Sequence, residues 1–148
     1  MTAGESGRMV GRTHHFPVRV YFADTDAAGI VYHATYLAFA ERARTEMMRL
    51  AGFDHVDLRT RFGLLLGVRS CEIDYLRAAR LDDQLEVRTT LEDVAGASMR
   101  LRQEVWRAAD EIARLNIRLA CIGPDGRAAR IPDEMREALQ NFVITEAI

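Results

Sequence analysis

The sequence predicts a single α+β domain in which an antiparallel sheet wraps around one long helix. The chain has 148 residues, the length of one ordinary domain. From Tyr36 to Leu50 apolar residues recur at helical spacing, whereas from about residue 70 to residue 121 apolar and polar residues alternate, which is typical of half-buried strands. The breaks between these strands are too short for a crossover helix, so we expect consecutive strands to pair antiparallel.

The remaining elements follow in chain order. Residues 1–13 are rich in Gly, Ser, Thr and Arg without periodicity, which predicts a flexible tail before a domain over residues 14–148. A first strand is expected over 16–22, with Pro17 near its edge or start. Gly52 is placed to end the long helix, and a short helical turn is expected over 55–61. Four strands and a short helix over 133–140 complete the domain; the strand breaks are expected at residues 81–83, 95–97, 108–110 and 123–126.

Composition excludes several classes of function. The formal net charge is −2, which gives no global attraction to nucleic acid or to an anionic membrane. All 20 basic residues are arginine, so chemistry that requires a lysine is excluded. Cys71 and Cys121 lie far apart with no metal-binding spacing, and no apolar segment is long enough to span a membrane. We therefore expect a cytoplasmic protein with no metal site and no stable membrane insertion.

The segment VYFADTDAAGIVYHATYLAFAERAR, residues 20–44, is the richest in candidate functional residues. It places Asp24 and Asp26 on a glycine-containing loop directly before the long helix, where functional side chains are often found. Aspartates in such positions also serve as turn and capping residues. Spacing alone leaves both roles open.

This region resembles a known family. DTDAAGIVYHATYLAFAERARTEMMR, followed by YLRAARLDDQLEV, is similar to the hotdog-fold acyl-CoA thioesterases related to 4-hydroxybenzoyl-CoA thioesterase, particularly those associated with the Tol-Pal envelope system. The resemblance runs from about Val18 to near Asp133. It implies hydrolysis of acyl-CoA or acyl-carrier-protein thioesters without a cofactor other than the coenzyme A of the substrate. It also implies a homo-oligomer, a dimer or a tetramer, with active sites between subunits.

The same resemblance assigns roles to individual residues. Asp26 matches the catalytic carboxylate, acting either as general base on water or as nucleophile. His33 matches the residue whose backbone N–H, at the helix start, points at the thioester oxygen. Asp24 is expected to hold the loop. Five further residues are candidates for substrate binding, namely Gly29, Tyr32, Tyr36, Arg69 and Arg77.

Alternatives remain open at this point. A different branch of thioesterases uses a helix glutamate, for which Glu41 is the candidate here, although a solvated or paired Glu41 explains the residue as well. A hotdog hydratase pairs Asp with His, but the seven-residue separation of Asp26 and His33 (33 − 26 = 7) is wider than that motif. A third possibility is a non-catalytic subunit that binds acyl-CoA or an acyl carrier protein.

Overall fold

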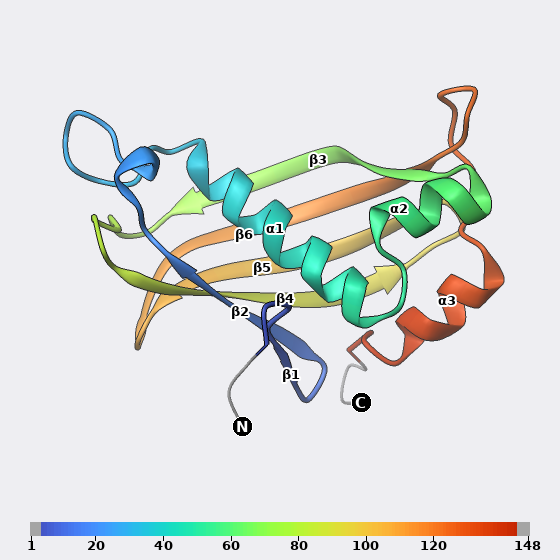
Figure 1. Cartoon of the computed structure of the whole chain (residues 1–148), viewed down its shortest axis with the longest axis horizontal. Helices are drawn as coiled ribbons and strands as arrows, with labels where there is room; N and C mark the ends of the chain where they lie inside the picture. The colour runs from blue at the N-terminus through green and yellow to red at the C-terminus, as the bar shows by residue number, and fades with distance from the viewer. Residues whose placement is uncertain (1–3, 145–148) are drawn as a thin grey trace.

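The computed structural model describes residues 4–144, in which six strands form one antiparallel sheet of order β1-β2-β4-β5-β6-β3 (Figure 1). Its strands are β1 (Arg8–Val10), β2 (Thr13–Arg19), β3 (Leu65–Tyr75), β4 (Gln84–Val94), β5 (Ser98–Arg107) and β6 (Asp110–Ile122). The helices are α1 (Thr35–Leu50), α2 (His55–Asp57) and α3 (Asp133–Gln140). A 3-10 turn over Phe22–Asp24 and a π-helical turn over Leu58–Phe62 lie between them. Residues 1–3 of the expected tail and 145–148 of the expected domain lie outside the described residues.

Helix α1 lies across one face of the sheet, and this packing forms the core (Figure 1). Its buried stripe includes Phe39, Ala40, Ala43 and Met47, each with no exposed surface. The two alanines let the helix backbone approach the sheet, so that the buried Gln103 of β5 donates a 2.8 Å hydrogen bond to the carbonyl of Ala40. The predicted helix is confirmed, and so is the predicted sheet wrapped around it.

The curvature of the sheet has a local cause. The pairing register shifts between Val68 and Ser70 in β3, between Leu91 and Asp93 in β4, and between Val105 and Trp106 in β5. An extra residue in one strand bends that strand and increases its twist. The shifts therefore allow the long strands to curve around α1 while their inner residues stay in the core.

The N-terminal region differs from the expectation of a flexible tail up to residue 13. Residues Arg8–Val10 form β1, which pairs with β2, and Gly7 and Gly11 adopt positive φ angles of 73° and 61° that permit the turns. The Ser6 hydroxyl donates a 2.7 Å hydrogen bond to Glu46 of α1. This hairpin is polar because it lies at a sheet edge, which is why its composition resembles that of a tail.

The first strand is shifted relative to the prediction. It was expected over 16–22, but β2 spans Thr13–Arg19, and Phe22 is 82% exposed in the 3-10 turn. The Asp24 carboxylate accepts a 2.8 Å hydrogen bond from the Tyr21 N–H, which turns the chain away from the sheet before Phe22. At the other end of α1, Leu50 was expected in the buried stripe but is 44% exposed.

One strand pairing was also predicted incorrectly. Strands β3 and β4 are consecutive in sequence but do not pair: β3 lies at the far edge beside β6, and β4 lies between β2 and β5 (Figure 1). The connection over residues 76–83 is longer than the break expected at 81–83 and crosses the end of the sheet. Its N-terminal end is held by Leu76, whose N–H donates to the Ile112 carbonyl at 2.9 Å. This crossing brings residues 75–80 beside the loop that carries Asp26. By contrast, the predicted short helix over 133–140 is confirmed as α3.

Candidate active site

The loop between β2 and α1 is held by its own backbone. The Tyr32 N–H donates to the Asp24 carbonyl at 2.9 Å, and the Asp26 N–H donates to the Ile30 carbonyl at 2.9 Å. The loop is also bound to the β3–β4 connection, because the Val31 N–H donates to the Ala79 carbonyl at 2.8 Å. The Asp24 carboxylate accepts a hydrogen bond from the Tyr21 N–H, which holds the start of this loop as expected for Asp24.

Asp26 is held by a local turn through one of its two carboxylate oxygens. Its Oδ1 accepts a 2.8 Å hydrogen bond from the Ala28 N–H, a local turn that fixes the carboxylate, and Gly29 closes the turn at φ 79°. Within the hydrogen bonds formed by residues 4–144, the other oxygen, Oδ2, accepts none. The carboxylate is thus oriented by one oxygen and has the other available to a water molecule or a substrate.

The start of α1 is a set of backbone donors without a side-chain cap. Its N-cap residue is Ala34, whose side chain has no acceptor, although Ser, Thr, Asp and Asn are the residues preferred there. In the part of the chain that the structure describes, the N–H of His33 donates to no protein acceptor. Free N–H groups and the positive end of the helix dipole favour negative charge. This helix start can therefore stabilise an oxyanion.

Asp26 and His33 line the same open pocket, which has a volume of about 360 Å³. One wall comes from the loop and the start of α1, and the other comes from the end of β3 and the crossing connection. The lining residues are Asp26, Ile30, Val31, His33, Tyr36, Tyr75, Leu76, Arg77 and Ala78. The pocket pairs a carboxylate with backbone donors and apolar walls, which is a suitable arrangement for attack on a carbonyl carbon.

Two of the five expected binding residues line this pocket. Tyr36 is buried, and its hydroxyl accepts a 3.4 Å hydrogen bond from the Ala79 N–H. Burial raises the pKa of Tyr36, so its hydroxyl keeps its proton at neutral pH. Arg77 also lines the pocket, but its Nη1 donates a 2.9 Å hydrogen bond to the Glu111 carbonyl. This nitrogen therefore already has a partner within the protein.

The other three do not line it in this chain. Tyr32 is 46% exposed, with its ring 4.4 Å from that of His33, and Gly29 serves the turn described above. Arg69 lies at the β3 register shift, six residues from Tyr75, which is roughly 20 Å along a strand. Within a single chain, Arg69 therefore does not line the pocket that contains Asp26.

Five lining residues were not identified from the sequence. Tyr75, Leu76 and Ala78 reach the pocket only because β3 lies at the far edge and its exit crosses back to the loop. Ile30 and Val31 follow Gly29 and belonged to the quoted loop, but nothing in their residue types indicated a site.

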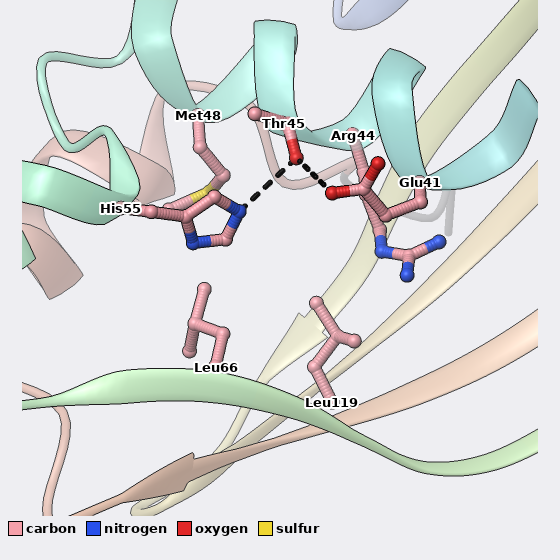
Figure 2. Close-up of a pocket in the computed structure, with 7 residues that line it drawn as sticks. All are labelled: Glu41, Arg44, Thr45, Met48, His55, Leu66 and Leu119. Atoms are coloured by element: carbon pink, nitrogen blue, oxygen red, sulfur yellow. Dashed lines mark hydrogen bonds between the residues drawn. The ribbon is translucent and has the colours of Figure 1, made fainter. Parts of the chain in front are cut away.

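A second, smaller cavity of about 60 Å³ lies between α1 and the strands β3 and β6 (Figure 2). Glu41, Thr45 and His55 form a hydrogen-bonded chain on one side: Thr45 Oγ1 lies 3.1 Å from Glu41 Oε1 and 3.1 Å from His55 Nε2. Leu66 and Leu119 form the opposite side. The volume suits a few water molecules. Glu41 is therefore a paired side chain in a separate cavity and does not line the pocket of Asp26.

Residues 4–144 contain neither a candidate metal cluster nor a candidate membrane-spanning helix. No group of three or more His, Cys, Asp or Glu side chains in this range is placed to hold a metal ion. No helix in the same range is long and apolar enough to cross a membrane.

Comparison with known proteins identifies relatives across most of the chain. A sequence model of the Thioesterase-like superfamily matches residues 20–139. Acyl-CoA thioesterase YbgC of Haemophilus influenzae is 42% identical over 114 residues, which cover 77% of this chain and 84% of that protein. Acyl-CoA thioester hydrolase YbgC of Escherichia coli is 40% identical over 110 residues, covering 74% and 81%.

Solved structures agree with the sequence relatives. A probable thioesterase from Bartonella henselae superposes with a TM-score of 0.79 at 35% identity, covering 81% of this chain and 99% of that chain. A hypothetical protein from Thermus thermophilus gives a TM-score of 0.83 at 28% identity, covering 90% and 99%. The family expected from the DTDAAGIVYH segment is confirmed: this chain belongs to the thioesterase-like superfamily.

Proposed function

We propose that this protein hydrolyses acyl-CoA thioesters to the free acid and coenzyme A, with Asp26 as the catalytic carboxylate and the start of α1 as the oxyanion site. The observation that carries the proposal is that Asp26 and the uncapped helix start at His33 line one pocket. The names of the two YbgC relatives support the same activity.

Each part of the site has a task in this reaction. Asp26 either takes a proton from water as it attacks the thioester carbonyl or attacks that carbon itself, and its oxygen without a protein partner is the one available for both. The carbonyl oxygen gains negative charge and is stabilised by the N–H of His33. The C–S bond then breaks and coenzyme A leaves as its thiolate. In the first route this gives the free acid directly, and in the second it gives an acyl–Asp26 anhydride, which water hydrolyses to the free acid and the regenerated carboxylate. The His33 imidazole has no required role in this scheme.

The test compares two aspartates on the same loop. Thiol release from a panel of acyl-CoAs is measured for the wild type, Asp26→Asn and Asp24→Asn, with the background from Cys71 and Cys121 subtracted. Asn keeps the shape of Asp and removes the base, so Asp26→Asn is expected to lower kcat by about 10²- to 10⁴-fold. Asp24→Asn retains an oxygen acceptor for the Tyr21 N–H and is expected to stay within about fivefold of the wild type.

Other outcomes point to the rival functions. Binding of acyl-CoA without thiol release, unchanged in Asp26→Asn, supports a non-catalytic subunit that binds acyl-CoA or an acyl carrier protein. Addition of water to an enoyl-CoA without thiol release supports a hydratase. We expect neither. We also expect turnover to survive chelating agents, because a carboxylate and backbone donors supply the base and the oxyanion site.

We further propose that the protein is a homo-oligomer, at least a dimer. Within residues 4–144, the eleven residues of strand β3, Leu65–Tyr75, have no partner strand on their outer side, and Val68 is 53% exposed there. Long apolar edges pair readily with another strand. Light scattering after size-exclusion chromatography is expected to give two or four chain masses, and Val68→Lys is expected to shift this toward one. Val10→Lys, at a valine on the opposite edge that is 48% exposed, is the control. A monomeric wild type contradicts the proposal.

A cytoplasmic location is also proposed. Both cysteines are unpaired thiols, which suits a reducing compartment. Fractionation of cells with an antibody to the protein tests this directly.

A further inference from the structure

Tyr75 connects the end of β3 to the start of α1. Its hydroxyl donates a 2.8 Å hydrogen bond to the carbonyl oxygen of His33. Its ring packs edge-on against two rings at the helix start, with centroids 6.4 Å from that of His33 and 5.7 Å from that of Tyr36. The Tyr75 side chain therefore contacts both the backbone carbonyl and the imidazole ring of His33.

This contact restrains the His33 backbone directly. In residues 4–144 it is the only hydrogen bond that either backbone group of His33 makes. Tyr75 itself is fixed, because it pairs with Ala113 of β6 and the next N–H, that of Leu76, donates to the Ile112 carbonyl. The phenol thus joins the rigid sheet to a helix start that has no side-chain cap.

The hydrogen bond acts on the peptide groups that face the reaction. The His33 carbonyl belongs to the same peptide group as the Ala34 N–H, and a donor on a peptide oxygen polarises the whole group. The bond also restricts rotation of the chain at His33, and so the direction of the His33 N–H. Burial raises the pKa of Tyr75, so its hydroxyl keeps the proton that it donates.

We propose that Tyr75 is a positioning residue, which holds the His33 peptide so that the N–H groups at the start of α1 meet the developing oxyanion. The proposal rests on the proposed thioesterase function for its effect on rate, but the hydrogen bond itself is testable without it. Tyr75 acts through His33, whereas Asp26 acts on the substrate.

The experiment removes only the hydroxyl. Tyr75→Phe keeps the ring, and since Tyr75 is 46% exposed the variant is expected to fold, which its melting temperature checks. Tyr21→Phe is the matched control, because the Tyr21 hydroxyl is exposed and makes no hydrogen bond in the described part of the chain. Two properties are measured on the full chain: kcat and KM with the best acyl-CoA, and the amide ¹H and ¹⁵N chemical shifts of His33 and Ala34 without substrate.

We expect Tyr75→Phe to lower kcat about tenfold, which corresponds to about 1.4 kcal/mol, with KM changed less than twofold. We expect the Ala34 amide resonance to move in Tyr75→Phe and to stay in place in Tyr21→Phe. A Tyr75→Phe enzyme with wild-type kcat, while Asp26→Asn is inactive, overturns the positioning role and leaves the proposed function standing. If the wild type hydrolyses no thioester, the proposed function fails, and an unmoved Ala34 resonance then overturns the positioning contact as well.

Discussion

The buried amide of Gln103 gives the sharpest prediction about stability. Its side chain is fully buried between the sheet and α1, and Nε2 donates to the Ala40 carbonyl at 2.8 Å and to Thr89 Oγ1 at 2.9 Å. Arg44 adds a long 3.5 Å contact to Oε1. Gln103→Leu keeps a similar size but removes both short bonds and leaves the Thr89 hydroxyl buried without this partner.

The expected cost follows from these contacts. Two buried hydrogen bonds contribute about 1 kcal/mol each, and an unpaired buried hydroxyl adds a penalty that the extra apolar surface of leucine partly offsets. We therefore expect Gln103→Leu to lower the free energy of unfolding by about 2 kcal/mol, which is about 6 °C in melting temperature for a chain of this length. Urea denaturation at one fixed protein concentration measures this.

A double variant separates the hydrogen bonds from other effects. Thr89→Val combined with Gln103→Leu replaces both partners by apolar groups, so its cost is expected to fall below about 1 kcal/mol. Gln84→Leu, at an exposed glutamine that begins β4, is the control and is expected to change stability by less than about 0.5 kcal/mol. If Gln103→Leu is as stable as the wild type, or if the double variant is the least stable of the set, the reasoning is wrong.

Two further predictions concern acid stability and the N-terminal hairpin. Burial alone raises the pKa of Asp83, but hydrogen bonds from the Arg80 N–H and from Arg107 Nη1, both 2.8 Å, lower it overall. Because the pKa of Asp83 is lower in the folded state, the ionised carboxylate stabilises the folded protein at pH values above the ordinary pKa of 3.8. This stabilisation is lost as the pH falls through the folded-state pKa. Asp83→Asn is thus expected to be less stable than the wild type at pH 7, with the difference shrinking in acid unfolding curves below pH 3.8; a constant difference contradicts this cause. A Cβ on Gly7 would overlap the His15 carbonyl oxygen, so Gly7→Ala is expected to open the β1–β2 hairpin and speed amide exchange there. Gly4→Ala, with open space around it, is expected to leave exchange unchanged.

Local patterns were sufficient for most of the elements. The spacing of Phe39, Ala43 and Met47 identified α1, and Gly52, at φ 91°, ends it as expected. Alternation identified β4, β5 and β6, and Pro132 marked the start of α3. The loop with Asp26 was recognised from contiguous residues, because both the turn at Gly29 and the start of α1 are formed within about ten residues of the chain.

The sequence by itself therefore determined the helix, the strands, the family and one wall of the site, since helical and strand periodicity and turn chemistry depend on residues close together in the chain. Only the tertiary structure decided that β3 pairs with β6. An alternating pattern fixes which face of a strand is buried, but it does not fix which other strand lies beside it. That choice supplied the second wall of the pocket. The same pairing brings the Tyr75 hydroxyl to the His33 carbonyl. Arg69 lies roughly 20 Å from Tyr75 along β3 and so does not reach this pocket.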